Sequence, residues 1–206
     1  KNMVEKKFYD EDYFENGLGS KKSCYENYRW IPELTIPMAN KLVNYLEINN
    51  NYKLLDFGCS KGYLVKALRL LDYDCYGVDI SEYAIKKIDP DIKTYCKLIN
   101  DSNLNPFEFE FDYLISKDVL EHMRLDQLEN LLTSFSKNCK NMFHVIPLGD
   151  DGNFRINEYH LDKSHVQIQN EEWWIDLFEK KGWKLEDFKY QINGIKDNRT
   201  KFDEKG

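Results

Sequence analysis

The feature that most constrains this chain is an apolar stretch that runs into a glycine-rich turn, Tyr52-Lys-Leu-Leu-Asp-Phe-Gly-Cys-Ser-Lys-Gly-Tyr63. After a helix-length interval, a second apolar stretch also ends in an acidic residue, in Tyr76-Gly-Val-Asp-Ile-Ser81. Asp56 and Asp79 are 23 residues apart, about the length of a strand, a turn, a helix and a second strand. The spacing therefore predicts a βαβ unit that holds a nucleoside at the carboxyl ends of its strands, where the Asp79 carboxylate accepts hydrogen bonds from both ribose hydroxyls.

The rest of the chain alternates between apolar runs of strand length and amphipathic stretches of helix length. This pattern predicts an α/β fold, a doubly wound, Rossmann-like sheet of six or seven strands, mostly parallel, with helices on both faces. A seventh strand would be antiparallel and would come from the last twenty residues. We expect strands at 53–57, 74–78, 93–98, 111–116, 141–146 and 183–190, and helices at 63–71, 81–88, 125–138 and 171–181, the last closed by Gly182.

Composition narrows the classes of function. With 206 residues we expect a single domain, 1–206, made of an aromatic-rich helical cap (1–50) and a core (51–206). A net charge of −7 argues against nucleic-acid binding, and without a run of about 18 apolar residues no membrane span is expected. Five scattered cysteines without a CxxC pair predict reduced thiols in a cytoplasmic protein. None of these numbers bears on the oligomeric state.

Together these motifs resemble the class I S-adenosylmethionine-dependent methyltransferases, and the resemblance covers about 52–147. The turn is similar to the family's acidic-x-Gly-x-Gly-x-Gly signature, with Ser60 in place of the middle glycine. The resemblance implies S-adenosylmethionine as cofactor, with Ile80 packed on the adenine and Asp101, or its neighbour Asn100, near the adenine amino group. The cofactor-binding residues it implies are Asp56, Gly58, Cys59, Gly62, Asp79, Ile80, Asp101, Lys117, Tyr25 and Arg29.

A second motif, Phe111-Asp-Tyr-Leu-Ile-Ser-Lys-Asp-Val-Leu-Glu-His-Met123, resembles the fourth-strand segment of small-molecule O-methyltransferases. By that resemblance Lys117 lies beside the methionine part of the cofactor. Asp118, Glu121 and His122 are spaced i, i+3 and i+4, so they can share a helical face. Such a cluster can act as a general base or hold a divalent metal such as Mg²⁺. The alternative is a helix N-terminus capped by Asp118, with His122 packed inward.

Two further histidines, His160 and His165, lie in the segment 148–169, the longest without a clear period and therefore a candidate functional loop. Either one can serve as the base or complete a metal site with Glu121 and His122, and the alternative is a surface histidine. Near the N-terminus, Tyr25 and Arg29 are spaced i, i+4, which on a helix would offer a phenol and a guanidinium to the cofactor's carboxylate.

The resemblance implies O-methylation of a small polar acceptor, with a sugar or nucleotide-activated sugar of surface-polysaccharide biosynthesis as first choice. His165 or His122 would be the base, oriented by Asp118 and Glu121. One alternative is a metal-dependent RNA 2′-O-methyltransferase, since small-RNA methyltransferases carry a similar Glu-x-x-Glu-His segment and a later histidine. The other is a SAM-binding module without activity.

Overall fold

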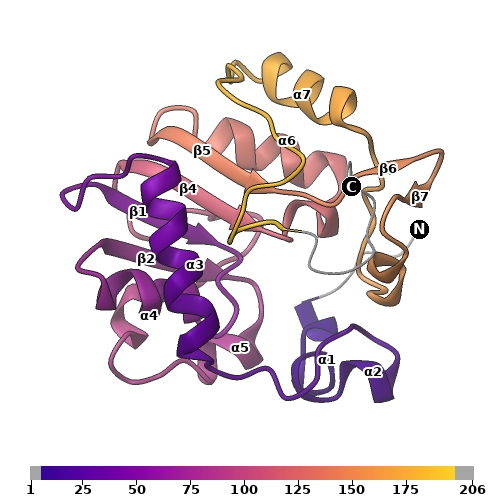
Figure 1. The fold of residues 1–206 in the computed structure, drawn as a ribbon, viewed down its shortest axis with the longest axis horizontal. Coiled ribbons are helices and arrows are strands. Elements are labelled where there is room, and N and C mark those ends of the chain that lie inside the picture. Colours follow the sequence, from indigo (N-terminus) through magenta and orange to yellow (C-terminus); the bar gives the residue numbers. More distant parts are fainter. Residues whose placement is uncertain (1–5, 198–206) are drawn as a thin grey trace.

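A five-stranded parallel sheet forms the centre of the protein in a computed structural model, which describes residues 6–197 (Figure 1). Its strands follow the order β3-β2-β1-β4-β5, and every neighbouring pair is parallel. The strand order reverses between β1 and β4, which is where doubly wound sheets bind ligands at their carboxyl ends. This architecture confirms the predicted fold class. The strands are β1 (Lys53–Phe57), β2 (Asp74–Asp79), β3 (Cys96–Leu98), β4 (Phe111–Lys117) and β5 (Cys139–Val145).

Helices cover both faces of the sheet because successive residues of a strand point to opposite sides. Leu54 packs in a cluster with α3 (Pro32–Tyr45) and α4 (Tyr63–Leu70). Its neighbour Leu55 packs in a second cluster on the other side, with α6 (Leu125–Ser134) and α7 (Glu171–Lys180). Gly182, with φ +87°, ends α7 in the left-handed conformation that the sequence predicts.

The N-terminal cap is only partly helical. Before α3, the described part of the cap contains three short helices, η1 (Lys6–Phe8), α1 (Glu11–Glu15) and α2 (Gly17–Ser20), and residues 21–31 are irregular. Tyr13 and Phe14 of α1 are buried against Ala84 of α5 (Glu82–Lys86), so α1 is anchored on the helix that follows β2. Ser81 caps α5 as predicted, because its side chain accepts a hydrogen bond from the amide of Ala84.

The predicted sixth strand at 183–190 is wrong, and within residues 6–197 the sheet has five strands rather than the predicted six or seven. Leu185 and Phe188, on which the strand pattern depends, are 45% and 40% exposed, so no buried face holds the segment in a ladder. Side chains anchor it instead: the Trp183 indole donates to the carbonyl of Leu132, and the Tyr190 hydroxyl donates to Glu171. A groove of about 550 Å³ runs between this segment, α7 and the free edge of β5.

The proposed seventh strand falls partly outside the described residues. Within the described part, the C-terminal region contributes one isolated bridge between Ile192 and Lys196. The segment 148–169 contains a small antiparallel hairpin, β6 (Gly149–Asp150) and β7 (Asn153–Phe154), followed by η4 (Asn157–Leu161). Two more single turns, η2 (Lys93–Tyr95) and η3 (Leu120–His122), precede β3 and follow β4. Across residues 6–197, no helix has the length and apolarity needed to cross a bilayer.

Candidate active site

The glycine-rich turn after β1 has the backbone conformation that its sequence demands. Gly58, Ser60 and Gly62 have φ values of +81°, +53° and +77°, so Ser60 takes the left-handed conformation of the glycine it replaces. The amides of Gly58 and Cys59 both donate to the carbonyl of Val78 at the end of β2, at 2.8 and 2.9 Å. A Cβ atom on Gly58 would lie 2.5 Å from the Val119 side chain, so the turn fits closely against the segment after β4.

The two carboxylates that the sequence singles out lie on neighbouring strands at this turn, since Asp56 is the next-to-last residue of β1 and Asp79 is the last residue of β2. The Asp79 carboxylate accepts the amides of Ser60 and Ser81, both at 2.8 Å, which leaves lone pairs on each oxygen for a ligand's hydroxyls. Burial raises the pKa of Asp79, although these backbone hydrogen bonds oppose the rise. Burial, and then the charge of Asp79, raise the pKa of Asp56 to about 7.

Neither carboxylate has a cationic partner here. No lysine or arginine of residues 6–197 contributes to the pKa shift of Asp56 or Asp79. A positively charged ligand that also carries ribose hydroxyls therefore fits these two carboxylates, and S-adenosylmethionine has both features. Ile80 is half-buried directly after Asp79 and packs against the apolar cluster of Leu55.

Asp101 and Asn100 occupy the exposed turn after β3. The Asn100 side chain accepts the amides of Ser102 and Asn103, which closes the turn. The Asp101 carboxylate instead accepts from Gln127 of α6 at 3.3 Å, which fixes its position relative to the helix after β4. The Asn100 side-chain oxygen is thus committed to its own turn, and both Asp101 oxygens contact Gln127.

A second cluster, which we call the Glu121–His122–His165 cluster, forms beyond the end of β4. The Glu121 carboxylate oxygen Oε1 lies 3.6 Å from Nε2 of His165 and 3.8 Å from Nε2 of His122. The Glu121 side chain is 0% exposed, and His165 and His122 are 7% and 14% exposed. Their potential ligand atoms all lie within 4.8 Å of one another. The structure thus brings together a carboxylate and an imidazole from one segment with an imidazole from the predicted functional loop.

Each residue of the cluster is also held by a contact outside the cluster. The backbone carbonyl of Glu121 accepts the amides of Val166 and Gln167, both at 2.9 Å, which ties the loop to η3. His165 Nδ1 lies 2.6 Å from the carbonyl oxygen of Tyr159, and His122 Nδ1 lies 2.7 Å from the Ser164 hydroxyl. These contacts fix the orientation of both rings.

Burial decides the charge states of the cluster. It lowers the pKa of His122 to about 4 and also lowers the pKa of His165, so both imidazoles are neutral near pH 7. Burial, reinforced by the charge of Asp118, raises the pKa of Glu121 well above its usual range. Two neutral imidazoles beside a buried carboxyl group can accept a proton or bind a cation.

The predicted helical face that joins Asp118 to Glu121 and His122 is wrong. Residue 118 has φ +54°, and only the single turn η3 follows, so Asp118 does not share a helical face with Glu121 and His122. It lies beside Lys117, with 3.0 Å between Oδ2 and Nζ. Burial opposes ionisation, but Lys117 and Lys196 lower the pKa of Asp118. Lys196 Nζ donates in turn to the Tyr159 hydroxyl at 2.6 Å.

Three other predicted site residues do not adopt the predicted arrangement. His160 turns toward the hairpin, where its Nε2 accepts the amide of Phe154, so it does not join the cluster. Tyr25 and Arg29 do not share a helix face, because residues 21–31 are irregular. Arg29 is exposed, whereas Tyr25 packs in the aromatic cluster of Tyr13.

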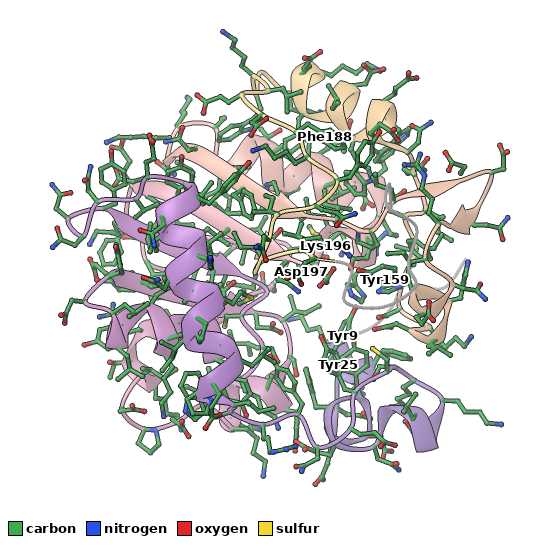
Figure 2. The ribbon with its side chains drawn as sticks, in the orientation of Figure 1. Tyr9, Tyr25, Tyr159, Phe188, Lys196 and Asp197 are labelled. Carbon is green, nitrogen blue, oxygen red and sulfur yellow. The ribbon has the colours of Figure 1, made fainter. Side chains whose placement is uncertain are left out.

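Two N-terminal residues at the site, Tyr9 and Tyr13, were not predicted from the sequence. The Tyr13 hydroxyl donates to Asp162 at 2.5 Å, and the Tyr9 ring lies 5.9 Å from the His122 ring. Figure 2 shows Tyr9 and Tyr25 extending from the α1–α2 segment toward the side that carries Tyr159 and Lys196. The signal that would have found Tyr9 and Tyr13 is the dense run of tyrosines in 8–28, from which only Tyr25 was predicted as a site residue.

Comparison with known proteins identifies the family. A model of the methyltransferase domain family matches residues 31–187, which is most of the chain. The chain therefore belongs to the methyltransferase domain family, as an S-adenosylmethionine-dependent class I member, and this confirms the family that the two strand motifs resemble. None of the curated proteins compared matches the sequence.

Solved structures share the fold at low sequence identity. A SAM-dependent methyltransferase from Archaeoglobus fulgidus is 20% identical over 79% of this chain and 73% of its own, with a TM-score of 0.57. The YcgJ protein of Bacillus subtilis is 14% identical over 70% of this chain and 67% of its own, with a TM-score of 0.53. A Haloferax volcanii complex of the Trm112 methyltransferase activator with a methyltransferase is 13% identical over 73% of this chain and 68% of its own, with a TM-score of 0.55. The match spans half the length of a Clostridium acetobutylicum SAM-dependent methyltransferase.

Proposed function

We propose that the protein transfers a methyl group from S-adenosylmethionine to a hydroxyl of a small polar acceptor, with a sugar or nucleotide-activated sugar of surface-polysaccharide biosynthesis as the first candidate. The observation that carries this proposal is the Glu121–His122–His165 cluster, which lies just past the tip of β4, next to the strand that carries the glycine-rich turn. A methyltransferase that acts on a hydroxyl must remove a proton, and this cluster supplies the groups for that step.

The donor site uses the two acidic strand ends. S-adenosylmethionine supplies the methyl group on a positively charged sulfonium. We assign Asp79 as the residue that binds the ribose hydroxyls. We assign Asp56 to the positively charged part of the donor, because a carboxyl group buried beside a second carboxylate favours a cationic neighbour. Gly58, Cys59 and Gly62 let the backbone approach the donor, Ile80 and Asp101 lie at its adenine, and Lys117 lies at its methionine end.

The acceptor site lies between the cluster and the N-terminal tyrosines. Alignment of donor and acceptor at near-attack distance contributes roughly 7–11 kcal/mol to such a transfer. A neutral His122 or His165 can accept the hydroxyl proton, or the cluster can hold a divalent ion such as Mg²⁺ that acidifies the hydroxyl. Tyr9 and Tyr159 add aromatic faces and hydroxyls that suit a polyhydroxylated acceptor.

The test is release of S-adenosylhomocysteine from a panel of sugar nucleotides, free sugars and phenolic metabolites, with and without chelator. We expect turnover with at least one sugar, and a loss of about 10²–10⁴ in kcat for His165→Asn. His160→Asn in the same loop is the matched control and should stay within about threefold. Turnover of RNA alone would replace the proposal with 2′-O-methylation. Tight donor binding without turnover across the panel would favour a module without activity.

We also propose that the protein works in the cytoplasm. All five cysteines are free thiols and four of them are buried, a usage typical of proteins kept in reducing compartments.

A further inference from the structure

The Glu121–His122–His165 cluster contains buried hydrogen-bond acceptors that have no donor within residues 6–197. Both oxygens of the Glu121 carboxylate are buried, and neither finds a hydrogen-bond partner among the described residues. Buried carboxylate oxygens without a donor are rare in native proteins, because each loses its hydration without compensation. Nε2 of His165 and Nε2 of His122 lie 3.6 and 3.8 Å from Oε1, beyond hydrogen-bond distance.

The hydrogen bonds behind the rings fix which nitrogen carries the proton. The carbonyl of Tyr159 can only accept, so Nδ1 of His165 is the protonated nitrogen of the neutral ring and Nε2 bears a lone pair. The Ser164 hydroxyl donates its single hydrogen to Asp162 at 2.5 Å, so Nδ1 of His122 must donate to that hydroxyl oxygen. Nε2 of His122 therefore also bears a lone pair.

The Glu121 carboxylate and Nε2 of both histidines are thus three electron-pair donors that lie close together. One cation can bind all three, whereas one proton cannot. A proton on Glu121 can satisfy only one of the two nitrogens. We propose that Glu121, His122 and His165 form a binding site for a divalent transition-metal ion such as Zn²⁺, Fe²⁺, Co²⁺ or Mn²⁺. Metal–ligand bonds of about 2.0–2.2 Å at tetrahedral angles put ligand atoms roughly 3.3–3.6 Å apart. The two distances from Glu121, 3.6 and 3.8 Å, are close to this range, and all three ligand atoms lie within 4.8 Å of one another, so the side chains must draw together to bind an ion.

The ligand chemistry selects the class of ion. Two imidazoles and one carboxylate suit Zn²⁺, Fe²⁺ and Co²⁺ better than Mg²⁺, which prefers an all-oxygen shell. The contacts of Nδ1 to Tyr159 and Ser164 are of the kind that orient metal-ligating histidines. Three protein ligands also leave open coordination positions. If the proposed function holds, these positions are where the acceptor hydroxyl binds, but ion binding itself does not depend on that function.

The test is a titration of the purified chain with Co²⁺, followed by visible absorption and by calorimetry, without donor or acceptor. We expect one ion per chain and visible bands of a low-coordinate site, displaced by Zn²⁺. Glu121→Gln, His122→Asn and His165→Asn should each weaken binding at least tenfold. His160→Asn, a histidine of the same loop outside the cluster, should bind within about twofold of the wild type. Thermal melting would verify that each variant is folded.

The outcomes separate this inference from the proposed function. Absence of stoichiometric Co²⁺ and Zn²⁺ binding by the wild-type chain would overturn the metal site, even if methyl transfer proceeds. Equal losses in His160→Asn and His165→Asn would also overturn it, because the ion would then lie elsewhere. Cluster-dependent binding without turnover on any acceptor would support the metal site and count against the proposed function.

Discussion

At the scale of single residues, the two acidic strand ends differ in what surrounds them. Asp79 is held by two backbone amides, which stabilise its charged form. Asp56 is 6% exposed, and burial together with the neighbouring Asp79 favours its protonated form, with a pKa of about 7. This difference fits a division of labour in which Asp79 binds hydroxyls and Asp56 responds to the positive charge of the donor.

The raised pKa of Asp56 predicts a pH-dependent stability. The unfolded chain loses this proton near pH 3.8 and the folded chain near 7, so the free energy of unfolding should fall between these values, by up to about 4 kcal/mol, and level off above. Asp56→Asn removes this contribution. Urea unfolding of the ligand-free protein from pH 4.5 to 8 should show the stability of the variant relative to wild type increasing up to about pH 7. A difference that does not change with pH would contradict the assignment.

Residue identities in the site were more predictable than residue contacts. The spacing of Glu121 and His122, and the pair of histidines in the loop, are visible in the sequence. The side chains that orient them are not, because Tyr13 and Asp162 are 149 positions apart and no local pattern encodes their hydrogen bond. The helical face predicted for Asp118, Glu121 and His122 is wrong because the i, i+3, i+4 rule assumes a helix, whereas the φ of +54° at Asp118 turns the chain there.

At the scale of elements, the glycine-rich turn joins three strands. Its amides bond to the end of β2, and Gly58 contacts Val119 beyond β4. The turn therefore sets the distance between the donor-binding strand ends and the segment that leads to the Glu121–His122–His165 cluster.

Replacement of Gly58 tests this close fit. Gly58→Ala should cost about 2–4 kcal/mol, since a left-handed alanine costs about 1 kcal/mol and the overlap with Val119 adds more. Gly152→Ala is the matched control, because φ is +80° there and nothing lies within 4 Å of the added Cβ. It should cost only about 1 kcal/mol. Denaturant unfolding of both variants measures the difference, and equal losses would show that Val119 yields without cost.

The sequence located the central strands well and the C-terminal one badly. β1 matches its prediction at both ends, since continuous apolar runs followed by turn residues are distinctive. The segment 183–190 has strand-like alternation, but whether an edge strand forms depends on a buried face supplied by distant residues. Here Leu185 and Phe188 stay largely exposed, and local alternation misled the prediction.

At the scale of the whole molecule, the N-terminal segment connects the two halves of the site. Lys61 of the glycine-rich turn forms an ion pair with Glu15 of α1 and donates to the carbonyl of Tyr28 at 2.6 Å. Tyr13 of the same helix bonds to Asp162 of the functional loop. The segment thus links the donor-binding turn to the loop that carries His165.

This link predicts a large effect for a small change. Tyr13→Phe removes a buried hydrogen bond to a carboxylate and should lower the free energy of unfolding by about 1.5–3 kcal/mol. Tyr45→Phe removes a similar but exposed bond to Asp187 and should cost less than about 1 kcal/mol. Parallel urea unfolding curves measure both. A Tyr13→Phe loss no larger than that of Tyr45→Phe would mean that α1 is not a structural part of the site.

The most direct test of the whole account is calorimetric titration of the chain with S-adenosylmethionine and S-adenosylhomocysteine. We predict one site per chain, and at least a tenfold rise in Kd for Asp79→Ala, about 1.4 kcal/mol. Asp74→Ala, at the opposite end of β2, should stay within about twofold. Failure of the wild-type chain to bind either ligand, or an unchanged Kd in Asp79→Ala, would contradict the claim that the ends of β1 and β2 hold the methyl donor.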